Sequence, residues 1–114
     1  MEITVRNLTN YRKVSYVHDG YHGEIHMYGD GFANCQVAPI AYIEDLLDCE
    51  DESFVVKVLR KLCLGYKNIV VIDIDNGYLK QVNNLLKNNI INTMPYKSTN
   101  GSNRVLVMFK TAYL

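Results

Sequence analysis

The chain has 114 residues, of which 48% are hydrophobic and 21% are charged, and these values are typical of one globular domain. Twelve basic and twelve acidic side chains cancel, so no overall positive charge draws the protein to nucleic acid. No apolar run approaches the length of a membrane span, and the amino terminus lacks the apolar segment of a signal peptide. We therefore predict a single domain over residues 1–114, located in the cytoplasm, with no membrane partner.

The first part of the chain alternates apolar and polar residues, as half-buried strands do. Strands are predicted over residues 3–8, 11–19, 21–28 and 32–47. Asp19-Gly20 has the composition of a tight hairpin turn between two of them. Pro39 interrupts or bulges the fourth strand, because proline cannot donate to a ladder.

The second part of the chain mixes helical and strand patterns. From Ser53 the apolar residues fall on one stripe of an amphipathic helix, which Gly65 ends. A nearly continuous apolar run over residues 69–74 predicts a central strand buried on both faces. A second helix is predicted from Asn76 to Asn89, followed by strands over 90–96 and 104–113. The order β-β-β-β-α-β-α-β-β predicts an α/β (α+β) fold with a mixed, mostly antiparallel sheet and two helices.

Carboxylates are concentrated where the fourth predicted strand meets the first helix. They are Glu44, Asp45, Asp48, Glu50, Asp51 and Glu52. Such a turn often binds phosphate, because the free N–H groups of the first helical turn point there. Here Asp51 and Glu52 would stabilise the helix dipole and repel a pyrophosphate. The cluster is either an interaction surface for a protein with a basic surface or a solvated helix start with no partner.

The predicted order resembles the GNAT superfamily of N-acetyltransferases. The resemblance is carried by AYIEDLL at 41–47 and by NIVVIDIDN at 68–76, and it covers about residues 40–110. It implies acetyl-CoA as cofactor and Glu44 as the base that deprotonates an amine. The family's Gln/Arg-x-x-Gly-x-Gly/Ala turn, whose N–H groups hold the coenzyme pyrophosphate, is replaced by EDESFVVK. The tyrosine that acts as the family's acid falls on Leu85, so Tyr78 substitutes only if the register shifts.

Two hypotheses follow, and they leave open whether the protein is an enzyme. In the first, a small GNAT-like protein has lost acyl-CoA binding, needs no cofactor and acts as a protein-interaction module. Its size and Asn-rich composition would suit a viral, phage or mobile-element product that modulates a host protein. In the second, the chain is an active acyl-CoA-dependent N-acetyltransferase with an unorthodox cofactor turn. Lys57, Arg60 and Lys61 would then reach the phosphates of the coenzyme.

Cysteine and histidine spacings do not predict a metal site. Cys35, Cys49 and Cys63 are too far apart for a metal knuckle and are interpreted as free thiols of a reducing compartment. His18, His22 and His26 recur every four residues, which would align them on a helix. The glycines and β-favouring residues around them predict a hairpin instead, in which residues four apart on a strand lie about 13 Å apart.

The nine tyrosines do not form an obvious nucleic-acid surface. They are not grouped with basic residues beyond Tyr11-Arg12-Lys13. Those within strand-like runs, which are Tyr16, Tyr21, Tyr28 and Tyr42, are explained by packing within a sheet. This pattern disfavours nucleic acid as a partner.

Overall fold

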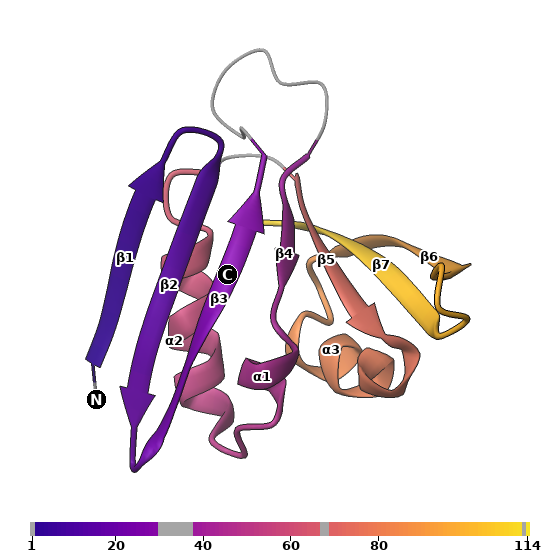
Figure 1. Ribbon diagram of the computed structural model, residues 1–114. Coiled ribbons are helices and arrows are strands. Elements are labelled where there is room, and N and C mark those ends of the chain that lie inside the picture. Colours follow the sequence, from indigo (N-terminus) through magenta and orange to yellow (C-terminus); the bar gives the residue numbers. More distant parts are fainter. Residues whose placement is uncertain (1, 30–37, 67–68, 113) are drawn as a thin grey trace.

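A mixed sheet of seven strands organises the fold (Figure 1). The structure, a computed structural model, describes residues 2–29, 38–66, 69–112 and 114. The strands are β1 (Glu2–Leu8), β2 (Tyr11–His18), β3 (Tyr21–Tyr28), β4 (Ile40–Tyr42), β5 (Ile69–Asp75), β6 (Ile90–Lys97) and β7 (Asn103–Lys110). The helices are α1 (Glu44–Leu47), α2 (Glu52–Leu62) and α3 (Leu79–Leu85), and the 3-10 turn η1 (Asn76–Tyr78) leads into α3. The strand order is β1-β2-β3-β4-β5-β7-β6, in which β4 and β5 are parallel and all other neighbours are antiparallel.

The hairpins predicted in the first part of the chain are confirmed. β1, β2 and β3 pair as an antiparallel meander, and their alternation buries Val14 and Ile25 completely. Asp19 and Gly20 form the turn between β2 and β3 with φ angles of 49° and 77°. Both angles lie in the left-handed region, which Asp and Gly tolerate better than most residues.

The fourth strand is much shorter than predicted. Of the range 32–47, residues 32–37 lie outside the described part of the chain, and only Ile40–Tyr42 is a strand. Glu44–Leu47 forms the short helix α1 instead. Leu46 and Leu47 are adjacent and both buried, at 0% and 3% exposure, whereas neighbours in a strand point to opposite faces. The described part of the chain therefore has three α-helices, not the two that we predicted.

The central strand is confirmed, and the second long helix ends early. β5 lies between β4 and β7, and both Val70 and Asp73 on its two faces are buried. The predicted helix over 76–89 begins as η1 and ends at Leu85, because its last residues form a turn. Asn89, a poor helix former, donates its side-chain N–H groups to the carbonyls of Lys110 and Ala112. This tertiary role explains why the helix stops before it.

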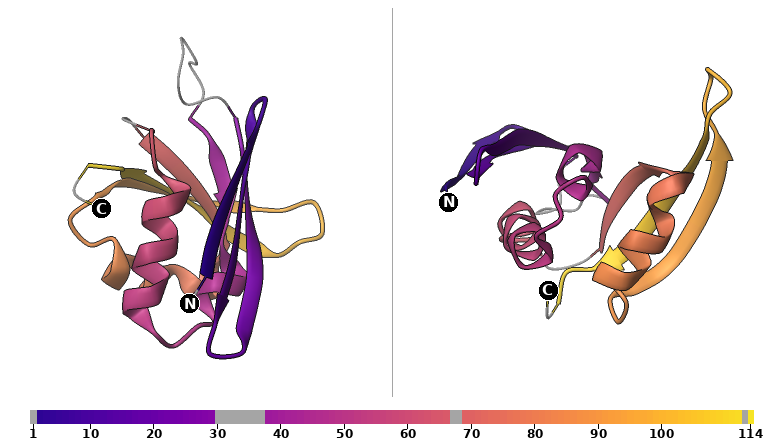
Figure 2. Two further views of the ribbon diagram at one scale, coloured as in Figure 1. Left: turned by 90° about the vertical axis from the view of Figure 1, so that its left-hand side faces the viewer. Right: turned by 90° about the horizontal axis from the view of Figure 1, so that it is seen from below.

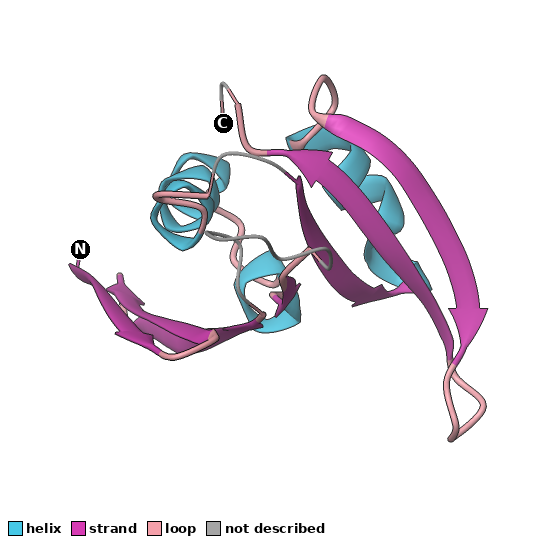
Figure 3. Ribbon diagram, turned by 90° about the horizontal axis from the view of Figure 1, so that it is seen from above, coloured by secondary structure: helices cyan, strands magenta, loops and turns pink. Residues whose placement is uncertain are grey.

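The two longer helices pack on the same face of the sheet (Figures 2 and 3). A buried row on that face runs across adjacent strands through Met27, Ala41, Ile72 and Val107. The helices complete this core with Phe54, Val55, Val58, Leu59 and Leu62 from α2 and Val82 from α3. Within the described residues, no helix is long and apolar enough to cross a membrane.

Candidate functional site

An acidic groove lies where the β2–β3 turn approaches the connection between α1 and α2. Its volume is about 450 Å³. The groove is lined by His18, Asp19, Tyr21, Asp48, Cys49, Glu50 and Asp51. Four of these residues are carboxylates, and three of them belong to the cluster that the sequence singled out. From the sequence alone, we did not assign His18, Asp19 and Tyr21 to this site. The β2–β3 turn reaches the α1–α2 connection through a tertiary contact, which the spacing of residues in the sequence does not reveal.

Asp51 fills the anion-binding position at the start of α2. Its carboxylate accepts hydrogen bonds from the N–H of Phe54 at 3.2 Å and from the Ser53 hydroxyl at 2.8 Å. The ring of His18 stacks on Phe54 and places Nε2 at 2.8 Å from Asp51 Oδ2. Chiefly the Ser53 and His18 hydrogen bonds lower the pKa of Asp51 to about 2. One free N–H of the first helical turn, that of Phe54, thus meets a carboxylate from the chain itself.

The Asp51 carboxylate should make stability depend on pH in the acid range. The pKa of Asp51 falls from 3.8 in the unfolded chain to about 2 in the folded protein. Its contribution to the free energy of unfolding is therefore complete above about pH 3.8 and is lost as the pH falls toward 2. Asp51→Asn keeps an acceptor for Phe54 but removes the titrating group. We expect the urea midpoint of wild type to exceed that of Asp51→Asn near about pH 5 and the two to converge near about pH 2.

Asp45→Asn is the matched control for this measurement. Asp45 lies in α1 and is exposed, and its side chain makes no hydrogen bond among those found in the described residues. Its variant should follow wild type more closely through the acid range. A difference between wild type and Asp51→Asn that stays constant from about pH 5 to about pH 2 would contradict the role given to Asp51.

Glu44 lies outside the groove, in an ion-pair network with β5 and β7. Its carboxylate is 2.5 Å from a terminal nitrogen of Arg104. Arg104 Nε also donates to Asp73 at 2.8 Å, and the hydroxyl of Tyr96 donates to the other oxygen of Asp73 at 2.5 Å. The hydrogen bond with Glu44 is the main cause that raises the pKa of Arg104. The structure therefore ties the candidate base to a guanidinium group, and Glu44 is not among the residues that line the groove.

The other carboxylates of the cluster differ in their surroundings. Asp48 accepts a hydrogen bond of 2.8 Å from the hydroxyl of Tyr78, and this bond is the main cause that raises the pKa of Tyr78 to about 12. Asp45, Glu50 and Glu52 are exposed and form no ion pair within the described part of the chain. These three side chains are accessible at the surface of the protein.

The histidines lie on the predicted hairpin, which is confirmed. His18 ends β2, whereas His22 and His26 lie on β3. Among the described residues, no group of three or more His, Cys, Asp or Glu side chains could hold a metal ion. Cys49 and Cys63 are buried free thiols, and burial raises the pKa of Cys63 to about 12. Cys35 lies outside the described residues.

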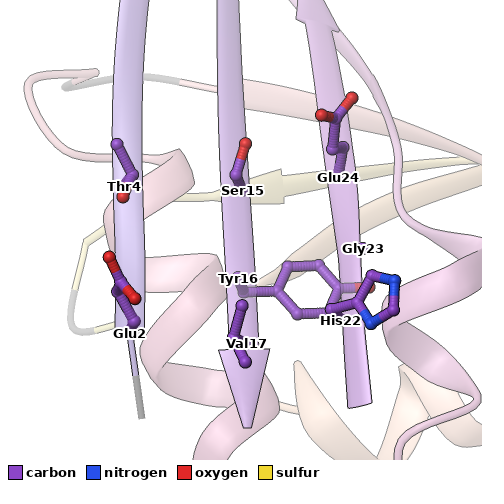
Figure 4. A pocket seen from close by; sticks show the side chains of 8 residues that line it. All are labelled: Glu2, Thr4, Ser15, Tyr16, Val17, His22, Gly23 and Glu24. Carbon is purple, nitrogen blue, oxygen red and sulfur yellow. The ribbon is translucent and has the colours of Figure 1, made fainter. Parts of the chain in front are cut away.

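The strand tyrosines are divided between the two faces of the sheet. Tyr16 lies in the core and stacks with Tyr21. Tyr28 and Tyr42 lie on the face opposite the helices, where they pack edge to face and remain about half exposed, at 50% and 45%. On the same face, a hollow of about 320 Å³ lies over β1–β3, with Thr4, Ser15 and Glu24 among its lining residues (Figure 4).

The chain was compared with models of protein families, with curated proteins and with solved structures, and none of them matches. The groove and the start of α2 are therefore the features from which a function can be inferred. The residues on which such an inference rests are the four carboxylates that line the groove, one of which, Asp51, also caps α2.

Proposed function

We propose that the chain is a GNAT-like protein-interaction module that has lost acyl-CoA binding and binds a basic segment of a protein partner in the acidic groove. The observation that carries this proposal is the placement of four carboxylates around one groove at the helix start. Lysine and arginine side chains complement such a groove, and the charges would steer their approach. The small size and Asn-rich composition support a cytoplasmic phage or mobile-element protein that modulates a host protein.

The Asp51 cap argues against coenzyme binding by the usual route. A pyrophosphate would have to displace Asp51 from the N–H of Phe54. It would then lie close to Asp48, Glu50 and Glu52, whose charges would repel it. The large side chain of Phe54 also stands in the first turn, where the family has a glycine-rich loop.

The arrangement of elements supports the GNAT-like part of the proposal. α1 lies in the connection between β4 and α2, and the strands and longer helices run in the order β1-β2-β3-β4-α2-β5-α3-β6-β7. The sheet is mostly antiparallel, with one parallel pair at β4 and β5. The resemblance on the sequence level begins at the same point, near residue 40. We therefore keep an acetyltransferase-like scaffold as part of the proposal.

The alternative, an active acyl-CoA-dependent N-acetyltransferase, requires a rearrangement of this site. Glu44 would have to leave Arg104 before it could accept a proton from an amine. Tyr78 would have to leave Asp48 and donate its proton with a pKa of about 12, far from the range that suits a general acid near neutral pH. These two contacts favour the module over the enzyme.

Two ligands distinguish the proposal from the alternative. Acetyl-CoA at about 1 mM should raise the melting temperature by less than about one degree, because a ligand stabilises by only RT ln(1 + [L]/Kd). An arginine-rich peptide should bind in calorimetry, and its affinity should fall as salt is added. Glu50→Lys should weaken peptide binding, whereas Glu24→Lys, on the far face of the sheet, should not.

Two outcomes would contradict the proposal. One is a melting-temperature rise of several degrees with acetyl-CoA that Glu44→Gln abolishes, which would support the enzyme. The other is an arginine-rich peptide that binds Glu50→Lys as tightly as wild type, which would show that the groove does not bind the peptide.

A further inference from the structure

The free edge of the sheet at β1 is open for pairing (Figures 2 and 3). The two-residue turn between β1 and β2 closes on Leu8 and Tyr11, which therefore form a hydrogen-bonded pair. Hydrogen-bonded and non-hydrogen-bonded pairs alternate along an antiparallel ladder, so the backbone N–H and C=O groups of Thr4 and Arg6 form hydrogen bonds with β2. Ile3 and Val5 direct their backbone N–H and C=O groups away from the sheet, toward the free edge.

The sequence of β1 is complementary to itself when two copies run antiparallel. With Thr4 on the twofold axis, Ile3 of one copy lies opposite Val5 of the other, and these are the residues with free backbone groups. In the same register, Glu2 of each copy lies opposite Arg6 of the other. These charges occupy non-bonded pairs, in which side chains approach most closely. The two threonines at the centre form another favourable cross-strand pair.

The charges on β1 are poorly matched within a single chain. Arg6 lies directly opposite Lys13 on β2, and like charges at such positions are unfavourable. Lys13 has its own partner in Glu24 at 3.6 Å, and neither Glu2 nor Arg6 forms an ion pair within the described residues. A second copy would provide both with an opposite charge.

The apolar residues of β1 also favour continuation of the sheet. Ile3 and Val5 point to the helical face and pack against the core, but they are only half-buried. Pairing with a second β1 would place Val5 and Ile3 of the other copy beside them. The core would then continue from one copy into the next, because both copies present α2 on the same face under a twofold axis perpendicular to the sheet.

The opposite edge of the sheet, at β6, is protected against pairing. Pro95 has no N–H group to donate. The register shifts between Ile90 and Asn92, and the N–H of Thr93 is bonded to the side chain of Asn92. Natural sheets use such bulges and prolines to block edges, and β1 has neither. Only one of the two edges is therefore suited to a partner strand.

We infer that the protein forms a symmetric dimer through antiparallel pairing of β1 with β1 of a second copy. The pairing joins two seven-stranded sheets into one and leaves both acidic grooves open, because the groove lies at the β2–β3 turn and the α1–α2 connection. The dimer would present two grooves to a partner, which increases avidity without new contacts. The inference is independent of whether the groove binds a basic protein.

A charge exchange tests the register. In the dimer, position 2 of each copy lies opposite position 6 of the other copy. Both of these pairs become arginine opposite arginine in the Glu2→Arg variant, and both become glutamate opposite glutamate in the Arg6→Glu variant. Each variant alone should dimerise at least about tenfold more weakly than wild type, because two opposite-charge pairs become like-charge pairs. A mixture of the two variants should form a heterodimer, since every arginine then faces a glutamate. Sedimentation equilibrium measures both results against the 13.1 kDa mass of the chain.

Amide exchange and a proline variant test the backbone pairing. In the wild-type dimer, the amides of Ile3 and Val5 should be protected in the same way as those of Thr4 and Arg6. Val5→Pro removes only an edge-facing N–H, so it should give a monomer with an unchanged far-UV spectrum. A wild-type protein that stays monomeric at millimolar concentration would overturn the inference. A dimer that persists in Val5→Pro, or a mixture of the charge variants that remains monomeric, would also overturn it.

Discussion

Replacement of Arg104 by methionine is expected to lower the free energy of unfolding by about 2–4 kcal/mol. Arg104 on β7 joins Asp73 on β5 to Glu44 at the start of α1, and its side chain is only 20% exposed. Asp73 is more deeply buried, with 9% of its side chain exposed. Without Arg104, its carboxylate would keep the hydrogen bond from Tyr96 but would have no cation in contact. A buried charge that loses its partner costs more than the pair contributes.

Urea unfolding of four variants measures this effect: Arg104→Met, Arg60→Met, Asp73→Asn and the double variant Asp73→Asn/Arg104→Met. Arg60→Met serves as the matched control, because Arg60 is exposed, its Nε donates to the carbonyl of Leu114, and it forms no ion pair within the described residues. The double variant Asp73→Asn/Arg104→Met should lose less stability than the sum of the single variants, since the orphaned charge is then absent. Equal losses for Arg104→Met and Arg60→Met would show that the network does not stabilise the junction of β4, β5 and β7.

The strands that the sequence predicts well are those whose side chains follow one periodic pattern. Alternation placed β2 and β3 correctly, and the apolar run of β5 predicted burial on both faces. The short helix α1 was missed, because its four residues are too few to show a helical period. Its sequence also follows directly on the β-favouring run AYI. In three dimensions, the hydrogen bond from the Leu47 N–H to the Ile43 carbonyl at 3.1 Å and the burial of two adjacent leucines distinguish it from a strand.

The candidate site was predictable in composition but not in its arrangement. The acidic turn follows from the sequence, which also predicts that Asp51 stabilises the helix dipole. The sequence predicts a helix that begins at Ser53 and does not identify Asp51 as the residue that caps it. The pairing of Glu44 with Arg104 does not follow from the sequence, because Arg104 lies 60 residues away in the chain. The contribution of Asp19 to the groove likewise depends on how the β2–β3 turn packs against α1. Such long-range partners are set by tertiary structure and not by spacing.

Replacement of Gly23 by alanine is expected to lower the free energy of unfolding by about 2–3 kcal/mol. The ring of Tyr16 extends from β2 across β3 and lies against Gly23 (Figure 4). A methyl group at this position would lie 2.6 Å from the Tyr16 hydroxyl oxygen and 2.9 Å from the ring carbon that carries it. Tyr16 is only 2% exposed and packs on Tyr21 and Phe54, so the ring has little room to move.

A double-mutant cycle of Gly23→Ala with Tyr16→Phe tests whether the contact with the Tyr16 hydroxyl causes this loss of stability. The Tyr16 hydroxyl is buried and has no hydrogen-bond partner within the described residues, so Tyr16→Phe should keep or raise stability. In the Tyr16→Phe background, Gly23→Ala should cost less than in wild type, because the closest contact disappears while the contact with the ring carbon remains. Glu24→Ala, whose Cβ points to the opposite face, controls for alanine in β3. Urea midpoints that fall equally for Gly23→Ala in both backgrounds would show that the hydroxyl does not cause the loss.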